Sequence, residues 1–418
     1  MKNYFRKVFK WGWYLICAPY AILATLLFLM VSPWITIRIG PLMSSRIGHF
    51  AANTELYLLE TKRGINLPVR RKVIDIFFLV QPVCNQHLAL MWSRKIKVYN
   101  RIFLLPVWKT NRILNRVLKT DPIRFEPGGT SQSDRDIHNL RNDTNSILSF
   151  TDKEEIRGQK LLRELGIPPN TDFVCLTVRD SAYLASQFPH KDWSYHNYRD
   201  SEIADYVLAA EALANDDIYV VRMGAKVHSP IPSKHPKIID YPCSGMRSDF
   251  LDIYLGANCL FCISQGTGFD AIPILFRKPV VYVNMVPISY FNTFYKKALG
   301  IFKHHISTHT GKQLTFNEIF QCGAGQCLSS ACFDQKGIIL KNNSPEEILD
   351  VVLEMKDRVN TDSWKEDYPL SNEQRRFWSL FPINARCESK FIRLHGEAVS
   401  LIGGKYLENN CRLLLGNI

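Results

Sequence analysis

The stretch of residues 259–284, CLFCISQGTGFDAIPILFRKPVVYVN, decides the fold that we expect for the chain. Residues 259–264 are almost entirely apolar, and residues 278–284 (KPVVYVN) show the same character, so both are predicted to be buried strands. Between them lie a glycine-containing turn and a helix that is expected to begin near Ala271. A strand, a helix and a second strand in this order form a βαβ unit, which indicates an α/β fold with a parallel sheet.

The turn between these two strands has the chemistry of a phosphate-binding loop. Two glycines separated by one residue lack side chains, so backbone N–H groups can approach an anion, and the start of the next helix adds positive potential. The alternative is a tight packing turn without a ligand, because a lone GxG sequence is common. The residues that we expect at this site are Ser264, Gly266, Thr267, Gly268 and Asp270.

Upstream, residues 173–179 (FVCLTVR) are predicted to form another strand of the same sheet. Its carboxyl end carries Arg179 and Asp180, with Tyr183 three residues further on. Open α/β sheets bind their ligands at the carboxyl ends of the strands. These three residues are therefore candidates for contact with an anionic ligand.

The alternation continues on both sides of that strand. Residues 201–214 are predicted to form a helix, and residues 218–223 and 238–240 two strands, with Gly224 ending the first of these. Arg222 belongs to that strand, and Arg247 precedes a helix that runs through residue 256. Further on, Ser344, Pro345 and Glu347 have the spacing of a capped helix start.

A second α/β layer is predicted nearer the amino terminus. Residues 34–42 (WITIRIGPL) have the composition of a strand, and after a loop residues 51–60 have that of a helix. Four polar side chains lie around the turn between them, and a histidine there is a natural general base near neutral pH. A histidine that caps the helix or packs in an interface is the alternative. We expect the catalytic residues to be His49 and Glu55, and the acceptor-side residues to be Arg46, Gly48 and Asn53.

Residues 11–37 form an apolar run without any charge, which predicts a segment that lies in or on a membrane. The run is long enough to span a bilayer, whereas Pro19 and Pro33 favour a re-entrant or interfacial helix. A buried amino-terminal helix of the core is a further alternative. We expect the folded domains on the cytoplasmic face of the inner membrane. Basic residues flank the run at Lys2, Arg6, Lys7, Lys10, Arg38 and Arg46.

The length and the charge of the chain limit the number of domains and the kinds of partner that we expect. The chain has 418 residues, of which 46% are hydrophobic. This hydrophobic fraction is typical of a folded protein, and the length exceeds what one ordinary core accommodates. We expect a membrane-associated segment at 1–37, domains at 38–165 and 166–360, and a helical segment at 361–418. The net charge of +13 attracts anions, but no nucleic-acid-binding motif accompanies it, so nucleic acid is not an expected partner.

The cysteines do not suggest a disulfide scaffold or a metal site. They number eleven, an odd count, and are spread over the whole length, so reduced thiols are expected. Cys322, Cys327 and Cys332 follow one another at steps of five residues, which is wider than a paired zinc knuckle. We expect loop or core cysteines and no metal.

Taken together, four motifs resemble a known group of enzymes. SSRIGHFAANTELYL, VCLTVRDSAYL, VVRMG and SQGTGFDAIPILFRKPVVYVN are similar to the motifs of a bacterial glycosyltransferase family found with surface-polysaccharide genes. The order of elements resembles the donor-binding half of GT-B glycosyltransferases, and more distantly fucosyltransferase-like enzymes. The resemblance covers about residues 38–355.

This resemblance implies a GT-B-like α/β fold, in which two Rossmann-like domains face a cleft that holds a nucleotide-sugar donor. Arg179 would face the diphosphate, and Arg222 and Gly224 would line the donor cleft. Ser264 and the glycine turn would contact the phosphates or the sugar, and His49 would be the base. A second arginine is absent beside Arg179, where Asp180 follows directly, so the nucleotide base stays open.

The implied reaction moves a hexose or deoxyhexose from a nucleotide sugar to a glycan or a lipid-linked acceptor. No cofactor is expected, because the nucleotide sugar is a substrate, and no DxD sequence lies in a suitable loop, so we expect no obligatory metal. A non-catalytic scaffolding protein for polysaccharide assembly that keeps this fold is the alternative. A Rossmann oxidoreductase is excluded, because no GxGxxG sequence follows a first strand.

Overall fold

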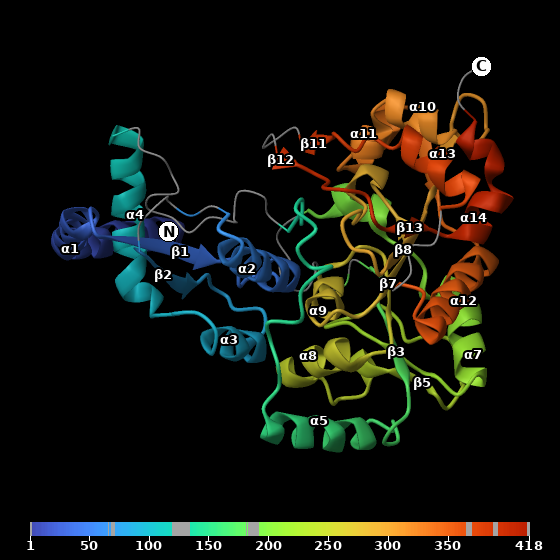
Figure 1. The fold of residues 1–418 in the computed structure, drawn as a ribbon, viewed down its shortest axis with the longest axis horizontal. Helices are drawn as coiled ribbons and strands as arrows, with labels where there is room; N and C mark the ends of the chain where they lie inside the picture. The colour runs from blue at the N-terminus through green and yellow to red at the C-terminus, as the bar shows by residue number, and fades with distance from the viewer. Residues whose placement is uncertain are drawn as a thin grey trace. The chain divides into compact units, whose positions relative to one another are not determined.

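The computed structural model describes residues 2–65, 67, 72–118, 134–180, 182, 192–364, 370–387 and 392–415 (Figure 1). Contacts between residues divide the chain into two compact units, Met1–Asp134 and Arg135–Ile418, which we call unit 1 and unit 2. Each contains helices and a parallel sheet, so the α/β class is confirmed. The domain boundaries given above and the arrangement of two domains about a cleft stay predictions.

Unit 2 is built on one sheet of seven parallel strands. From edge to edge the strands follow the order β13-β8-β7-β6-β3-β4-β5. The chain starts in the middle at β3, moves outward on one side through β4 and β5, and then returns to build the other side from β6. This is the doubly wound arrangement of nucleotide-binding folds. The strands are β3 (Phe173–Leu176), β4 (Tyr219–Arg222), β5 (Ile238–Asp240), β6 (Cys262–Ser264), β7 (Val280–Met285), β8 (Ala298–Phe302) and β13 (Leu401–Ile402).

The βαβ unit that the sequence predicts is confirmed as β6, α9 and β7. Helix α9 (Ala271–Leu275) begins at the predicted residue and follows the 3₁₀ turn η5 (Gly268–Asp270). All six residues of β7 are buried. A strand covered on both faces by helices must be apolar throughout, which is why this strand was readable from composition alone.

Helices cover both faces of the sheet in unit 2. In Figure 1, α7 (Val207–Asn215) and α12 (Pro345–Thr361) lie together on one face, and α5 (Asp152–Glu164), α8 (Asp249–Asn258) and α9 lie on the other. The predicted start of α12 is confirmed, because Ser344 and Glu347 form a reciprocal capping box and Pro345 is the first helical residue. The other helices are α10 (Phe316–Gln321), α11 (Ser330–Gln335), α13 (Asn372–Leu380) and α14 (Gly404–Asn409).

Short elements complete unit 2. Two antiparallel pairs lie outside the main sheet: β9 (His304–Ser307) with β10 (Ile338–Lys341), and β11 (Arg386–Cys387) with β12 (Ile392–Arg393). The 3₁₀ turns include η2 (Ser194–Arg199), η3 (Ile203–Tyr206), η4 (Tyr241–Cys243), η6 (Ile288–Tyr290), η7 (Ala324–Gln326) and η8 (Cys411–Leu414). Of these, η2 bears most directly on the functional site.

Unit 1 contains two long parallel strands with helices around them. Strands β1 and β2 pair in register from Ile35 opposite Lys72 to Leu42 opposite Leu79. Beside them, Val98 forms a single parallel bridge to Phe77. The elements are α1 (Lys2–Val31), β1 (Ile35–Leu42), α2 (Ile47–Lys62), β2 (Lys72–Leu79), α3 (Gln86–Ser93) and α4 (Arg101–Leu118).

A buried ion pair joins the two strands of unit 1. Arg38 in β1 is fully buried, and its guanidinium donates two hydrogen bonds, each 2.6 Å, to the carboxylate of Asp75 in β2. The Tyr57 hydroxyl of α2 donates to the same carboxylate. Burial and the negative charge of Asp75 raise the pKa of Tyr57. A charged side chain within a buried strand is thus tolerated because its partner lies directly opposite in the register.

The predicted amino-terminal membrane segment needs correction. Among the helices that the structure describes, none combines the length and the apolarity needed to cross a membrane. Instead, α1 has an inner side that packs within unit 1: Ala21 is buried together with Val107 of α4, and the Thr25 hydroxyl donates a 2.8 Å hydrogen bond to Asn111. The apolar run therefore reflects, in part, packing against α4 and the sheet.

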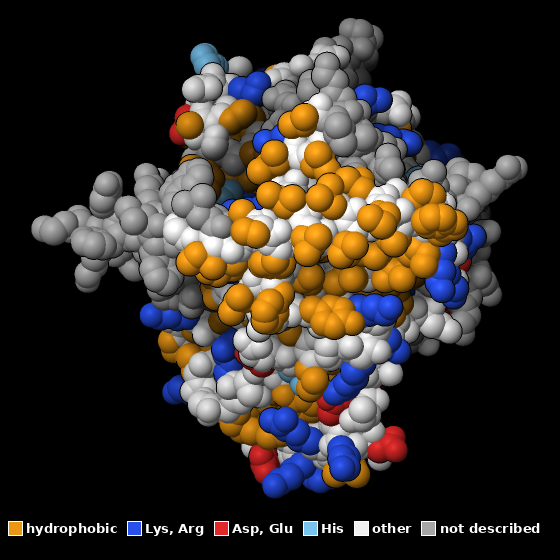
Figure 2. All heavy atoms as spheres, turned by 90° about the vertical axis from the view of Figure 1, so that its left-hand side faces the viewer, with side chains coloured by type: hydrophobic (Ala, Val, Ile, Leu, Met, Phe, Trp, Pro, Cys, Tyr) orange, Lys and Arg blue, Asp and Glu red, His pale blue; other side chains and the backbone are white. Residues whose placement is uncertain are grey.

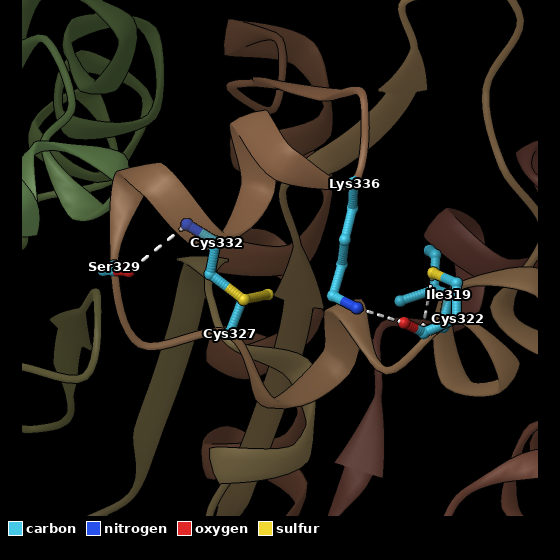
Figure 3. The surroundings of a disulfide bond; sticks show 6 residues. All are labelled: Ile319, Cys322, Cys327, Ser329, Cys332 and Lys336. Carbon is cyan, nitrogen blue, oxygen red and sulfur yellow. Dashed lines mark hydrogen bonds between the residues drawn. A yellow bond between two sulfur atoms is a disulfide. The ribbon is translucent and has the colours of Figure 1, made fainter.

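The expectation of reduced cysteines is wrong for one pair. Cys327 and Cys332 form a disulfide with a Cα–Cα distance of 5.6 Å, which ties the segment after η7 to α11 (Figure 3). Cys322 is a free thiol that donates to the Ile319 carbonyl, and it does not join the pair. Two cysteines five residues apart can reach each other here because a turn and the first residues of a helix lie between them.

Candidate functional site

The candidate site lies where the strand order of unit 2 reverses. Strands β3 and β6 are neighbours in the sheet, although the chain leaves β3 towards one edge and leaves β6 towards the other. Their carboxyl ends therefore open side by side, at the switch point where doubly wound sheets bind ligands. Residues 177–180 follow β3 at this point, and residues 265–268 follow β6.

The glycine turn after β6 is held by its own side chains. The Ser264 hydroxyl accepts a 3.2 Å hydrogen bond from the Gly266 N–H and donates one of 3.2 Å to the Asp270 carboxylate. Thr267 lies beside Thr177 of the β3 loop, with 3.4 Å between the hydroxyl oxygens. Ser264 and Asp270 are buried, so among the predicted site residues these two position the turn.

Gly266 is required by the local geometry, whereas Gly268 is not shown to be. The φ angle of Gly266 is +70°, and an added Cβ atom would lie 3.0 Å from the sulfur of Met285. Both the backbone conformation and the space therefore favour glycine. Gly268 is exposed and begins η5.

Arg179 reaches this turn from the β3 side. Its backbone N–H donates to the side chain of Gln265, which in turn donates to the Ser201 hydroxyl. Its guanidinium lies 3.3 Å from the Asp200 carboxylate, and 16% of the side chain is exposed. Arg179 is thus fixed through its backbone while its charged group stays accessible, and the structure brings it to the predicted turn.

Arg199 is a cation of this site that was not among the predicted residues. It is the last residue of η2, and its guanidinium donates to the carbonyl oxygen of Gly266. Burial, and secondarily the positive charge of Arg179, lower the pKa of Arg199. Two arginine side chains thus lie beside one glycine turn, and the carboxylates of Asp200 and Asp270 act on Arg199 in the opposite direction. The sequence signal was the polar and aromatic loop of residues 190–199, from which no single residue stood out.

Lys303 is the third cation and was also missed. It follows β8, it is only 5% exposed, and its ammonium group donates a 2.6 Å hydrogen bond to the Asp200 carbonyl. Burial lowers the pKa of Lys303 to about 8, although Asp200 and Asp205 act in the opposite direction. The available signal was positional, because Lys303 follows the apolar strand ALGIF as Arg179 follows its own strand.

The lowered pKa of Lys303 predicts a pH-dependent affinity for anions. Below pH 8 the side chain is a cation, and above pH 8 it loses its charge, so affinity for inorganic pyrophosphate is expected to fall between pH 7 and pH 9. The protonated fraction declines about tenfold over that interval, which sets the size of the effect. Titration calorimetry of the wild type and of Lys303→Met measures it. Because the probe's own titration affects both proteins equally, an unchanged ratio of the two affinities across this range would contradict the assignment.

Arg222, at the end of β4, forms an ion pair with Asp180, which follows the neighbouring strand β3. Arg222 is 2% exposed, and its guanidinium lies 3.3 Å from the Asp240 carboxylate of β5 and 3.8 Å from that of Asp180. Asp180 also accepts hydrogen bonds from the backbone of Ala182 and His228. In the described structure both residues therefore order the loops beside the switch point. Their predicted contact with the donor stays a prediction.

The remaining predicted donor residues lie around this region. Gly224 has a φ of +153°, and an added Cβ would lie 3.1 Å from Val227, so glycine fits there for conformational reasons. Arg247 donates a 2.7 Å hydrogen bond to Asp252 of α8, at the β5 side of the sheet. Tyr183 lies outside the described residues.

A DxD sequence does occur at residues 134–136, and its environment indicates a structural role. Asp136 is buried, and its carboxylate accepts hydrogen bonds of 2.9 Å from the backbone N–H groups of Leu140 and Arg141. The side chain of Arg135 donates to the carbonyl oxygens of Phe291 and Leu394. Arg135 and Asp136 are therefore occupied in ordering the chain, whereas Asp134 is exposed. Among the described residues no group of three or more His, Cys, Asp or Glu side chains is arranged to hold a metal ion.

In unit 1, the structure brings His49 and Asn53 together but not Glu55. Helix α2 follows the carboxyl end of β1, and His49 is its third residue. Asn53, four residues later, lies on the same side of the helix, and the His49 Nδ1 and Asn53 Oδ1 atoms are buried without a hydrogen-bond partner in the described structure. Glu55 is fully buried and, six residues from His49, projects from a different side.

The two other acceptor-side residues, Gly48 and Arg46, lie at the start of the same helix. Arg46 is its exposed N-cap residue and makes no side-chain cap hydrogen bond. Gly48 is in the first turn. The loop thus presents a cation and two unpartnered polar atoms at the carboxyl end of β1.

Comparisons with known proteins identify similar structures but no family. Neither protein-family models nor curated protein sequences match the chain. ADP-heptose LPS heptosyltransferase II from E. coli is similar to 79% of this chain and 99% of its own, with 11% identity and a TM-score of 0.42. A family 9 glycosyl transferase from Veillonella parvula is similar to 77% of this chain and 97% of its own, with 10% identity and a TM-score of 0.43.

A third similar structure is the E. coli heptosyltransferase WaaC with ADP-2-deoxy-2-fluoro heptose. It is similar over 59% of this chain and 88% of its own, with 11% identity and a TM-score of 0.29. With these three TM-scores below 0.5, the similarities do not by themselves define the fold or the function of this chain.

Proposed function

We propose that the protein is a glycosyltransferase that moves a hexose or deoxyhexose from a nucleotide sugar to a glycan or a lipid-linked acceptor. The observation that carries this proposal is the meeting of Arg179 and Arg199 at the Gly266 turn, at the switch point of the unit 2 sheet, with Lys303 joined to them through Asp200. A diphosphate is the ligand whose size and charge suit three cations and a glycine turn.

The same groups supply the chemistry of the reaction. When the glycosidic bond to the diphosphate breaks, negative charge develops on the departing phosphate oxygens. Cations already fixed by burial stabilise that charge without reorganising, and Arg179 is fixed through its backbone bond to Gln265. We therefore propose transfer that uses these side chains, with no obligatory metal and with no cofactor beyond the donor itself.

His49 is the proposed base for the acceptor hydroxyl. Its buried Nδ1 atom has no hydrogen-bond partner in the described structure, and Asn53, on the same side of α2, offers a second open polar atom for a hydroxyl or its water. Glu55 is fully buried and projects from another side of the helix, so it does not take part in this proton transfer beside His49.

The direct test is release of a nucleoside diphosphate and formation of a glycosylated product. Purified protein is incubated with a panel of nucleotide sugars and with glycan or lipid-linked acceptors, and both products are quantified. Release that depends on both donor and acceptor supports the proposal. If no donor binds and no product forms with any pair, the proposal fails and the scaffolding alternative is favoured.

His49→Ala is expected to lower kcat about 100-fold and leave donor affinity unchanged, because a general base acts on the acceptor and not on the diphosphate. Steady-state kinetics and donor titration measure the two quantities separately. His138→Ala is a control at another described histidine, one that is not placed in the site. Equal losses of kcat in both variants, or a loss of donor affinity in His49→Ala, would contradict the role assigned to His49.

A further inference from the structure

Helices α1 and α4 of unit 1 present a continuous apolar surface to the outside. They lie against each other, linked by the Thr25–Asn111 hydrogen bond and by one from the Tyr20 hydroxyl to the Phe103 carbonyl. Figure 2 shows the resulting face, which is covered with hydrophobic side chains over a wide area. Twelve of the 22 large exposed hydrophobic side chains in the described chain belong to α1, α4 and Trp34. We call this the α1–α4 face.

The side chains of this face stand opposite the buried sides of both helices. In α1, Leu23 is 60% exposed and Met30 is 67% exposed, whereas Ala21 and Thr25 on the other side are buried. Trp34, just after the helix, is 72% exposed. Helix α1 is therefore apolar on both sides, although only one side has a partner within unit 1. A surface of this extent is uncommon on soluble proteins and marks an interaction site.

Helix α4 adds a basic border to the apolar surface. Ile113 and Val117 are 64% and 71% exposed on one stripe of the helix. Arg112 and Arg116 are exposed on the adjoining stripe, and the Arg112 guanidinium lies over the ring of Trp108, 4.9 Å from its centroid. Arginine side chains that border an apolar surface in this way can hold their charges at the level of polar head groups.

The charge of the surrounding sequence restricts what can cover this face. The sequences of α1 and α4 contain eight lysines and arginines and no aspartate or glutamate. Two copies of the chain joined through this face would bring two cationic borders together, which disfavours self-association. An apolar surface bordered by the cations of α4 is complementary to an anionic lipid surface, where apolar side chains enter the acyl region and cations meet the head groups.

We propose that the α1–α4 face binds the surface of an anionic bilayer, with both helices lying along it and neither crossing it. The cytoplasmic face of the inner membrane is the anionic surface that such a chain would meet. Apolar contact and charge attraction act together in this mode of attachment, so binding requires both. The proposal does not rest on the proposed glycosyl transfer, because it concerns a surface of unit 1 that is distinct from the unit 2 site.

Vesicle flotation of the full-length protein tests the proposal without donor or acceptor. Vesicles of phosphatidylcholine alone and of phosphatidylcholine with phosphatidylglycerol are compared. The protein is expected to float with the anionic vesicles, at least about tenfold more strongly than with the neutral ones, and to lose binding as salt is raised. Equal flotation with both vesicle types, or none with either, overturns the proposal.

Two matched variants separate a surface effect from misfolding. Ile113→Glu places a charge on the face and is expected to lower the vesicle affinity about tenfold. Ile156→Glu makes the same change at an isoleucine on α5 that is 71% exposed, and is expected to leave affinity unchanged. Circular dichroism confirms that both variants fold. Equal binding by the two variants would refute the assignment.

The charge contribution has its own pair of variants. Exchange of both Arg112 and Arg116 for glutamine is expected to weaken binding to anionic vesicles only, whereas the same exchange at Lys160 and Arg163 of α5 changes nothing. Sedimentation analysis addresses the competing occupant: a stable dimer that Ile113→Glu dissociates would show that a second copy covers the face, and would overturn the proposal.

Discussion

Replacing Arg179 by alanine is expected to lower kcat/KM for sugar transfer by about 100- to 1000-fold, the loss that follows when one fixed group that stabilises developing charge is removed. Arg179 combines an accessible guanidinium with a backbone held by Gln265, so its charge lies at the turn before the donor arrives. Rates of nucleoside-diphosphate release, measured at saturating and at limiting donor, give the effect on kcat and on kcat/KM.

Two further variants make this expectation specific. Arg179→Lys keeps the charge but not the planar guanidinium, so partial recovery is expected. Arg358→Ala removes a partly exposed arginine of α12 that is also paired with a carboxylate, that of Glu354, and is expected to leave the rate unchanged. If Arg179→Ala retains more than about a tenth of the wild-type rate, the diphosphate is not held by this side chain.

Replacing Asp75 by alanine is expected to destabilise the protein by about 3–5 kcal/mol, because the fully buried Arg38 guanidinium loses its counter-ion. The cost arises mainly from the loss of the carboxylate that faces the buried Arg38 charge, since the Tyr57 hydroxyl, which also loses its acceptor, is neutral. Urea unfolding followed by circular dichroism measures the change in the free energy of unfolding.

The double variant Arg38→Met, Asp75→Ala distinguishes this cause from simple loss of packing. Removing both charges is expected to restore most of the stability, because no uncompensated charge then remains. Lys160→Ala, at an exposed ion pair on α5, is expected to have no measurable effect. Equal losses in the Asp75→Ala single variant and in the double variant would show that shape, and not charge, dominates at this site.

The elements that could be predicted best from the sequence are those whose structure depends on residues close together in the chain. Strand β7 was readable because a strand covered on both faces has no polar residue to interrupt it, and the start of α12 because its cap lies within four residues. The glycine turn was found for the same reason: Gly266 must adopt a positive φ, which is a property of that residue and its neighbours.

The site was only partly predictable because its cations come from distant parts of the chain. Arg199 contacts Gly266, and Lys303 contacts Asp200, across 67 and 103 residues of sequence. No local pattern marks such a contact, since it depends on which strands become neighbours. Conversely, Arg222 at the end of β4 and Asp180 after β3 stand where ligand-binding residues do, and the structure shows them 3.8 Å apart as an ion pair.

The amino-terminal helix shows a different limit of composition. An uncharged apolar run has the same composition whether it contacts lipid or packs against another helix. In α1 one side is buried against α4 and the other is not, and the contacts on the buried side, such as the hydrogen bond from Thr25 to Asn111, join residues far apart in sequence. Arg38 marked the end of the apolar run in the sequence, yet in the structure it is the buried partner of Asp75.

The position of β13 in the unit 2 sheet has a consequence for folding during synthesis. Leu401 and Ile402 pair with Leu299 and Gly300 of β8, at the edge of a sheet whose other strands are all encoded earlier. Until the ribosome has translated these two residues, β8 presents unpaired backbone groups to other chains. Unit 1 can fold as soon as its own residues have emerged, whereas unit 2 stays exposed to aggregation through β8 until Leu401 and Ile402 have emerged.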